Sequence, residues 1–165
     1  MAMVSLGFYL QRKKSEERLL ADSSVNKEYA PIAGDAKYVE LALGFAYGAN
    51  AGLTNTAGVQ TLSGTGACRV GGHFFSKFVA KPEGLDKVPI YIPTPTWGNH
   101  LAIFRECGMD IRRYQYYSPS TNRLDYNWQM EDLKDAPDGS VILLHGEDST
   151  STCYSKTDKN VVISK

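Results

Sequence analysis

The chain has 165 residues, of which 42% are apolar and 22% are charged, so its composition is that of a globular domain rather than a disordered segment. Its 18 basic and 18 acidic side chains leave no net charge at pH 7, which disfavours nucleic acid and anionic membranes as partners. No stretch approaches the ~20 apolar residues that span a bilayer, and the three cysteines form no C-x-x-C pair, so a disulfide framework and a metal site are not expected either.

The first part of the chain predicts two helices separated by a loop. Gln11–Asp22 is charged and amphipathic, which favours a helix with a solvated face. Lys27-Glu28-Tyr29-Ala30-Pro31 predicts a loop, because a proline disfavours helix at the residue before it. Apolar side chains then recur at helical spacing from Ala36 to Tyr47, and Gly48 is suited to end that helix.

The order of apolar and basic residues at the N-terminus indicates whether the chain carries a secretion signal. The basic residues Arg12, Lys13 and Lys14 follow the apolar opening of the chain, whereas a signal peptide places basic residues before it. There is no evident small-residue cleavage site. We therefore expect an intracellular protein.

From residue 59 onward, short apolar runs alternate with helical patterns. The predicted strands are Val59–Leu62, Val88–Ile92, Asp110–Tyr117 and Val141–Leu144. The predicted helices carry an apolar stripe of Val70, Phe74, Phe75 and Phe78, then run over Leu101–Cys107, then from an N-cap at Asp125 through Ala136. This alternation is typical of an α/β fold, here a partial three-layer, open and mainly parallel sheet with covering helices. After His145 the chain turns polar, and only Val161–Ile163 could form a strand.

The segment Ser63-Gly64-Thr65-Gly66-Ala67 is a candidate anion site. It lies where a predicted strand gives way to a helix, so free backbone N–H groups and the positive end of the helix dipole converge there. The dinucleotide fingerprint fails at Arg69, and the Gly-Lys-Ser/Thr of a Walker loop is absent. Taken alone, such a segment is more often an ordinary glycine-rich turn from a strand into a helix.

Three further side chains are candidates for a ligand site. Trp97 and His100 follow the next predicted strand, and loops at the carboxyl ends of adjacent parallel strands line one crevice. Trp97 could offer a flat face to a planar ring, and Tyr29 could reach a ligand from its loop. The alternatives are a half-buried structural tryptophan, a hydrogen-bonded core histidine and a surface tyrosine. His145 ends the fourth predicted strand and could likewise be either an active-site group or a structural histidine.

With these residues in view, the sequence resembles the class I, fold-type I, pyridoxal-phosphate-dependent aminotransferases, in particular the aspartate aminotransferases, from about residue 12 to 145. Several motifs carry the resemblance in the same order along the chain. They are Lys27–Ile32, Val59–Ala67, Pro93–His100 with Phe104-Arg105, Tyr116-Tyr117 and Gly139–His145. The resemblance implies an incomplete cofactor-binding α/β domain at 27–145, like the N-terminal part of the family's large domain, preceded by a helical segment at 1–26 and followed by a divergent polar tail at 146–165.

The resemblance also implies roles for individual residues. Ser63, Gly64 and Thr65 match the positions that hold the cofactor phosphate, and Trp97 matches the aromatic residue stacked on the pyridine ring. His100 matches a histidine that positions the aspartate facing the ring nitrogen. Tyr29 matches a tyrosine that reaches the cofactor of the other subunit in a homodimer. Each pairing is physically sensible, because phosphate needs donors and a flat cation favours a π-face.

The chain departs from the family after His145, where Gly146-Glu147-Asp148-Ser149-Thr150 replaces an Asn-Pro-Thr-Gly loop. The Schiff-base lysine, the ring-nitrogen aspartate and the arginines that bind substrate carboxylates have no counterparts. We therefore predict a fragment of an aspartate aminotransferase-like enzyme, one that exchanges amino groups between aspartate and 2-oxoglutarate in its complete form. No catalytic residue is assigned in this chain, which is expected to bind pyridoxal phosphate weakly or not at all and to be inactive alone.

Two alternatives remain open. The chain could be a non-catalytic interaction protein that pairs with a full-length aminotransferase subunit, or a small phosphate-binding module built on Ser63–Thr65. The family includes cytoplasmic and mitochondrial members, and the N-terminus does not distinguish these compartments.

Overall fold

The computed structural model describes residues 2–26, 28–48 and 56–144. The chain divides into two compact units, Met1–Gln60 and Thr61–Lys165, which are taken separately below. No helix in the described ranges is both long and apolar enough to cross a membrane. His145 and the polar tail that follows it lie outside the described residues, as does the predicted strand at 161–163.

The first unit contains two helices, α1 (Ala2–Ala21) and α2 (Ala36–Tyr47). Helix α1 begins earlier than the charge pattern predicted, and Gln11–Asp22 covers only its second half. Helix α2 has the predicted bounds. The carboxylate of Asp35 accepts the Tyr38 N–H at 2.7 Å and caps its start, while Gly48 ends it with φ 81°, a left-handed conformation that glycine adopts without strain.

The second unit is built around a parallel sheet with the strand order β2-β1-β5. Strand β1 (Pro89–Thr94) pairs in parallel with β2 (Asp110–Gln115) over six residues, with Ile90 opposite Ile111. It pairs on its other side with the short strand β5 (Val141–Ile142). This confirms the predicted parallel α/β sheet. The predicted strand over 110–117 is interrupted, because Tyr117–Ser118 forms β3 in an antiparallel hairpin with β4 (Arg123–Leu124).

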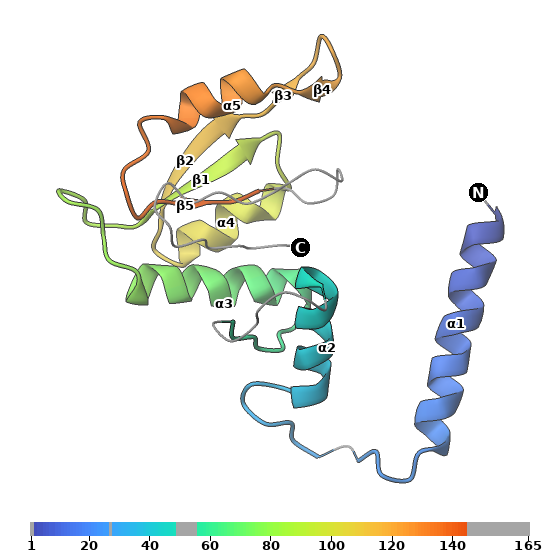
Figure 1. Cartoon of the computed structure of the whole chain (residues 1–165). Helices are drawn as coiled ribbons and strands as arrows, with labels where there is room; N and C mark the ends of the chain where they lie inside the picture. The colour runs from blue at the N-terminus through green and yellow to red at the C-terminus, as the bar shows by residue number, and fades with distance from the viewer. Residues whose placement is uncertain (1, 27, 49–55, 145–165) are drawn as a thin grey trace. The chain divides into compact units, whose positions relative to one another are not determined.

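Two cores lie on opposite faces of this sheet, because side chains alternate along each strand. Ile90 and Ile92 of β1 pack into one core with side chains of α3 (Ser63–Phe78) and α4 (Gly98–Glu106). Tyr91 packs into the other core with Tyr114 and with side chains around α5 (Tyr126–Leu133). The result is the predicted three-layer arrangement, with α3 and α4 below the sheet and α5 above it in the view of Figure 1.

Strand β1 is central to both cores and is almost wholly buried. Ile90 and Ile92 have no exposed surface, and Pro93 is among the largest fully buried side chains. Proline is tolerated near the end of this central strand, where the ladder with β5 has already stopped at Tyr91. On the α5 face, the buried Tyr114 hydroxyl donates a 2.8 Å hydrogen bond to the Leu143 carbonyl, which ties β2 to the chain beyond β5.

The predicted strand at Val59–Leu62 is wrong. Residues 56–61 have no regular secondary structure. Gln60 is bonded to the loop before α2 and not to a sheet neighbour, since the Gln60 N–H donates to the Ala33 carbonyl and the Gln60 side chain accepts the Asp35 N–H, both at 2.9 Å. Val59 and Leu62 are the two apolar residues among these four, which is too little pattern to separate a strand from a loop.

The predicted apolar stripe of α3 is also largely wrong. Val70, Phe74 and Phe78 are 48%, 54% and 74% exposed, whereas Cys68, Gly72 and Phe75 form the buried face. The small side chain of Gly72 explains this choice, because it lets α3 approach the Phe104 and Cys107 side chains closely. Phe74 and Phe78 instead contact each other, with ring centroids 5.4 Å apart.

The remaining helices follow the predictions with shifted ends. Helix α4 starts three residues earlier than predicted, at Gly98, and its end is followed by Gly108 with φ 80°. Helix α5 starts after its predicted cap, Asp125, whose carboxylate accepts the Trp128 N–H at 3.0 Å, but it ends at Leu133 rather than Ala136.

Candidate active site

The first candidate residues, Ser63, Gly64 and Thr65, lie in the first turn of α3 rather than in a turn before it. The Ser63 N–H donates to the Thr61 carbonyl and the Gly66 N–H donates to the Leu62 carbonyl, both at 3.0 Å. Between them, the amides of Gly64 and Thr65 have no backbone acceptor among the described residues. Leu62, the residue before the helix, makes no side-chain capping bond. Within the part of the chain that the structure describes, this helix therefore presents two amides without a backbone acceptor at the positive end of its dipole.

Ser63 has an unusual backbone conformation. Its φ is 61°, in the left-handed region that residues other than glycine rarely adopt. Such a conformation raises the energy of the chain and often occurs where a loop is shaped for a ligand. The side chains of Ser63 and Thr65 are exposed, so both hydroxyls can add to the amide donors at this helix end.

Trp97 and His100 lie at the start of α4, directly after the carboxyl end of β1. Trp97 is the residue before the helix and is half-buried, and His100 is 4% exposed within its first turn. Their rings meet edge to face with centroids 5.2 Å apart. Nδ1 of His100 shares a 2.9 Å hydrogen bond with the Thr96 hydroxyl, so the imidazole is held on both sides. The His100 ring is thus fixed in place, whereas part of the Trp97 ring stays accessible to a ligand.

The geometry brings these two groups of residues to one edge of the sheet. Helices α3 and α4 pack against each other and against the same sheet face. Both begin on the side where β1 and β2 end (Figure 1). Ligands of open parallel sheets bind at the carboxyl ends of the strands, so this edge is the expected location for a site.

Thr94 is a polar residue at this edge whose importance the sequence did not indicate. It is the last residue of β1, and its hydroxyl is buried without a hydrogen-bond partner among the described residues. Such unpaired groups are costly and uncommon. A threonine between two prolines gives no sign of this in the sequence, because β-branched residues are ordinary at strand ends.

Tyr29 belongs to the first unit and is fully exposed, with no hydrogen bond through its side chain among the described residues. His145 lies outside the described residues. Tyr114, Tyr116 and Tyr117 were expected to serve in packing. Tyr114 is buried in the core on the α5 face and Tyr116 packs against that core, whereas Tyr117 lines a pocket.

Two residues of the second unit have shifted pKa values for structural reasons. Burial is the main cause that raises the pKa of the Cys107 thiol. The hydrogen bond from Arg112 to the Tyr91 hydroxyl is the main cause that raises the pKa of the Arg112 guanidinium, with Asp110 adding to it. No group of at least three histidine, cysteine or carboxylate side chains in the described part of the chain is arranged to hold a metal ion.

Comparison with known proteins identifies the family. A family model described as aminotransferase class I and II matches residues 6–147, which is most of the chain. The chain belongs to the class I and II aminotransferases. Aspartate aminotransferase 1 of Medicago sativa is 43% identical over 136 residues, which cover 81% of this chain and 31% of that protein. The mitochondrial aspartate aminotransferase of Gallus gallus is 37% identical over 84% of this chain and 32% of its own length.

Solved aminotransferase structures agree with this assignment. The aspartate aminotransferase from Saccharomyces cerevisiae cytoplasm superposes with a TM-score of 0.71 at 34% identity, over 81% of this chain and 32% of that one. The broad specificity aminotransferase from Leishmania mexicana gives a TM-score of 0.67 at 40% identity, over 80% of this chain and 32% of that one. This aminotransferase chain thus spans about a third of the length of the relatives it matches.

Proposed function

We propose that residues 27–145 form part of the pyridoxal-phosphate site of an aspartate aminotransferase-like enzyme. The observation that supports this most directly is the start of α3, where the Gly64 and Thr65 amides, the hydroxyls of Ser63 and Thr65, and a left-handed Ser63 coincide. This set of neutral donors at a helix N-terminus suits a phosphate group. When bound, pyridoxal phosphate supplies the electron sink through which amino groups pass between an amino acid such as aspartate and a 2-oxo acid such as 2-oxoglutarate.

In this proposal each residue has a binding or orienting role. Ser63, Gly64 and Thr65 hold the phosphate, and Trp97 lies against the pyridine ring. His100, hydrogen-bonded to Thr96 and in contact with the Trp97 ring, positions the aspartate that faces the ring nitrogen in the complete enzyme. Tyr29 reaches the phosphate of a second subunit in a homodimer, which its full exposure in the first unit permits.

We expect that this polypeptide alone does not catalyse transamination. No lysine matches the residue that must carry the cofactor and move the proton, and no carboxylate matches the partner of the ring nitrogen. If three of these four donors bond to the charged phosphate at once, they contribute roughly 5–9 kcal/mol. Loss of rigid-body freedom opposes binding by about 4–15 kcal/mol. We therefore expect millimolar or weaker binding, and no turnover of aspartate with 2-oxoglutarate.

A binding experiment tests the phosphate site separately from catalysis. Pyridoxine 5′-phosphate is a suitable probe because it lacks the aldehyde that reacts with lysines, and pyridoxine is its control without phosphate. In a Trp128→Phe background, Trp97 is the one tryptophan left, so tryptophan fluorescence reports on contact between Trp97 and the pyridine ring of the probe. We expect quenching by the phosphate ester at millimolar concentration and much less by pyridoxine.

Two substitutions in α3 sharpen this test. Thr65→Val removes a proposed phosphate donor and should weaken the quenching several-fold, whereas Ser76→Ala, near the other end of the same helix, should not. Equal quenching by the two probes, or equal effects of the two substitutions, would refute the phosphate site. Steady production of oxaloacetate and glutamate by the purified chain would refute the proposed inactivity.

A second candidate function is suggested by the first unit, where Tyr29, Ile32 and Phe45 are each more than 90% exposed. Apolar side chains in such number commonly mark a protein interface. The chain could therefore pair, without catalysis of its own, with a full-length aminotransferase subunit in the cytoplasm or mitochondrion, the compartments named for its relatives. Co-purification with an intact aspartate aminotransferase tests this, and strictly monomeric behaviour in its presence would refute it.

A further inference from the structure

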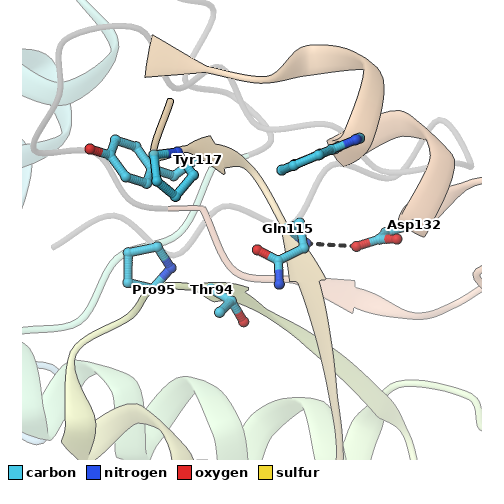
Figure 2. A pocket seen from close by; sticks show the side chains of 7 residues that line it. Thr94, Pro95, Gln115, Tyr117 and Asp132 are labelled. Atoms are coloured by element: carbon cyan, nitrogen blue, oxygen red, sulfur yellow. Dashed lines mark hydrogen bonds between the residues drawn. The ribbon is translucent and has the colours of Figure 1, made fainter. Parts of the chain in front are cut away.

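A pocket lies on the α5 side of the second unit, and the phosphate site proposed above does not use it. Its volume is about 550 Å³, within the range of small-molecule sites. It is lined by Thr94, Pro95, Gln115, Tyr117, Pro119, Trp128 and Asp132. Figure 2 shows Tyr117 and Pro95 on one side, Asp132 on the other and Gln115 between them. The Thr94 hydroxyl points away from these side chains (Figure 2), so it is not a donor to this pocket.

Tyr117 and Trp128 provide the aromatic side chains of this pocket. The Tyr117 hydroxyl donates to Oδ1 of Asn122 at 2.6 Å, which fixes the phenol ring within the β3–β4 hairpin. Trp128 is in the first turn of α5, where its backbone N–H is capped by Asp125 at 3.0 Å. The indole is 51% exposed and the Tyr117 ring is half-buried, so both retain accessible surface.

Asp132 adds a negative charge to the aromatic surfaces. It lies four residues after Trp128 and therefore on the same side of α5. One carboxylate oxygen, Oδ2, accepts the Gln115 N–H at 2.7 Å and fixes the side chain against β2. None of the ion pairs formed by the described residues involves Asp132, so its charge is not neutralised by a neighbouring cation there.

These features select a class of ligand. Aromatic faces and a carboxylate attract cations, and an alkylated ammonium gains from both while its methyl groups contact apolar surface. A phosphate or carboxylate ligand would be repelled by Asp132. A sugar would need more hydrogen-bond partners than Gln115 and Asp132 supply. We propose that this pocket binds a small organic cation that carries an alkylated ammonium group.

Choline and 3,3-dimethyl-1-butanol, its uncharged carbon isostere, are matched probes for this site. The chain contains two tryptophans, so a nitrogen-labelled sample gives two indole N–H signals in a heteronuclear NMR spectrum. We expect choline to shift the Trp128 signal saturably and to leave the Trp97 signal in place. The isostere should shift neither signal at the same concentration, because it has the shape of choline without its charge.

Substitution of the carboxylate tests the role of charge. Asp132→Asn should weaken choline binding by about two- to fivefold, the range expected for one interaction at a solvent-accessible site. Asp138→Asn, an exposed aspartate in the turn before β5 that does not line the pocket, should have no effect. Circular dichroism of each variant checks that the fold is kept.

The proposal is overturned by any of three results: no saturable shift of the Trp128 signal, an equal shift with the uncharged isostere, or equal binding by Asp132→Asn and the unaltered chain. If Asp132→Asn does not fold, raising the salt concentration on the unaltered chain replaces it, since salt screens exposed charges and should weaken choline binding. Salt-independent binding would then overturn the proposal.

Discussion

Gly72 is the residue whose substitution tests the packing of the second unit most directly. A Cβ atom at this position would lie 2.7 Å from Sγ of Cys107 and 3.1 Å from Cδ1 of Phe104. Alanine favours a helix interior over glycine by about 0.8–1 kcal/mol. Overpacking a buried contact costs about 1–3 kcal/mol. Because Phe104 is 0% and Cys107 is 5% exposed, neither of these side chains can move into solvent. We expect Gly72→Ala to lower the free energy of unfolding by about 1 kcal/mol.

Urea unfolding followed by circular dichroism measures this change, and Gly44→Ala provides the matched control. Gly44 also lies within a helix, but a Cβ there would meet no atom within 4 Å. Its substitution should therefore raise the stability of the first unit by roughly 0.5–1 kcal/mol. Cys107→Ala removes the closest atom, so Gly72→Ala should cost less in that background. If Gly72→Ala is as stable as the unaltered chain, the close packing of α3 against α4 is wrong.

Two further predictions concern a helix cap and a buried thiol. Asp125→Ala removes the bond to the Trp128 N–H and should lower the free energy of unfolding of the second unit by about 1 kcal/mol, measured by urea unfolding, whereas Asp125→Asn should largely preserve the cap. Because burial raises the native pKa of Cys107, the unfolded chain loses this proton first as pH rises, so the native state loses stability above the ordinary thiol pKa of about 8.5. Urea unfolding between pH 7 and 10 should show a decline that Cys107→Ala reduces, and an identical decline in that variant would contradict this.

The sequence was sufficient for the architecture of the second unit because its signals were redundant. Strand β1 is an apolar run bounded by prolines, α5 has an aspartate cap, and Gly108 and Gly139 adopt the positive φ values of 80° and 84° that turns require. These local signals agree with the parallel topology. The predicted strand at residue 59 rested on a weak signal, two apolar residues among four. Gln60 instead bonds to Ala33 and Asp35 in the loop before α2, which a pattern within residues 59–62 cannot predict.

The apolar stripe of α3 shows a different limit. Periodicity ranked Phe74 and Phe78 as core residues because they are large and apolar, yet both are mostly exposed. The side of α3 that contains Gly72 is buried instead, because the absence of a side chain at Gly72 allows α3 to approach α4 closely. Likewise, the buried hydroxyl of Thr94 and the pocket next to Asp132 depend on contacts between elements distant in sequence, which no local pattern encodes.

The carboxyl end of β1 connects the two proposed sites. Thr94 and Pro95 line the pocket on the α5 side, and the next two residues, Thr96 and Trp97, lead into α4 on the opposite face. Thr94 ends β1, and Pro95, Thr96 and Trp97 follow it outside the strand, so this one short segment contributes residues to both sites. Trp97 reports on whether choline in the pocket affects the phosphate site. Its indole signal should stay fixed when choline binds if β1 is as rigid as the burial of Pro89–Pro93 implies.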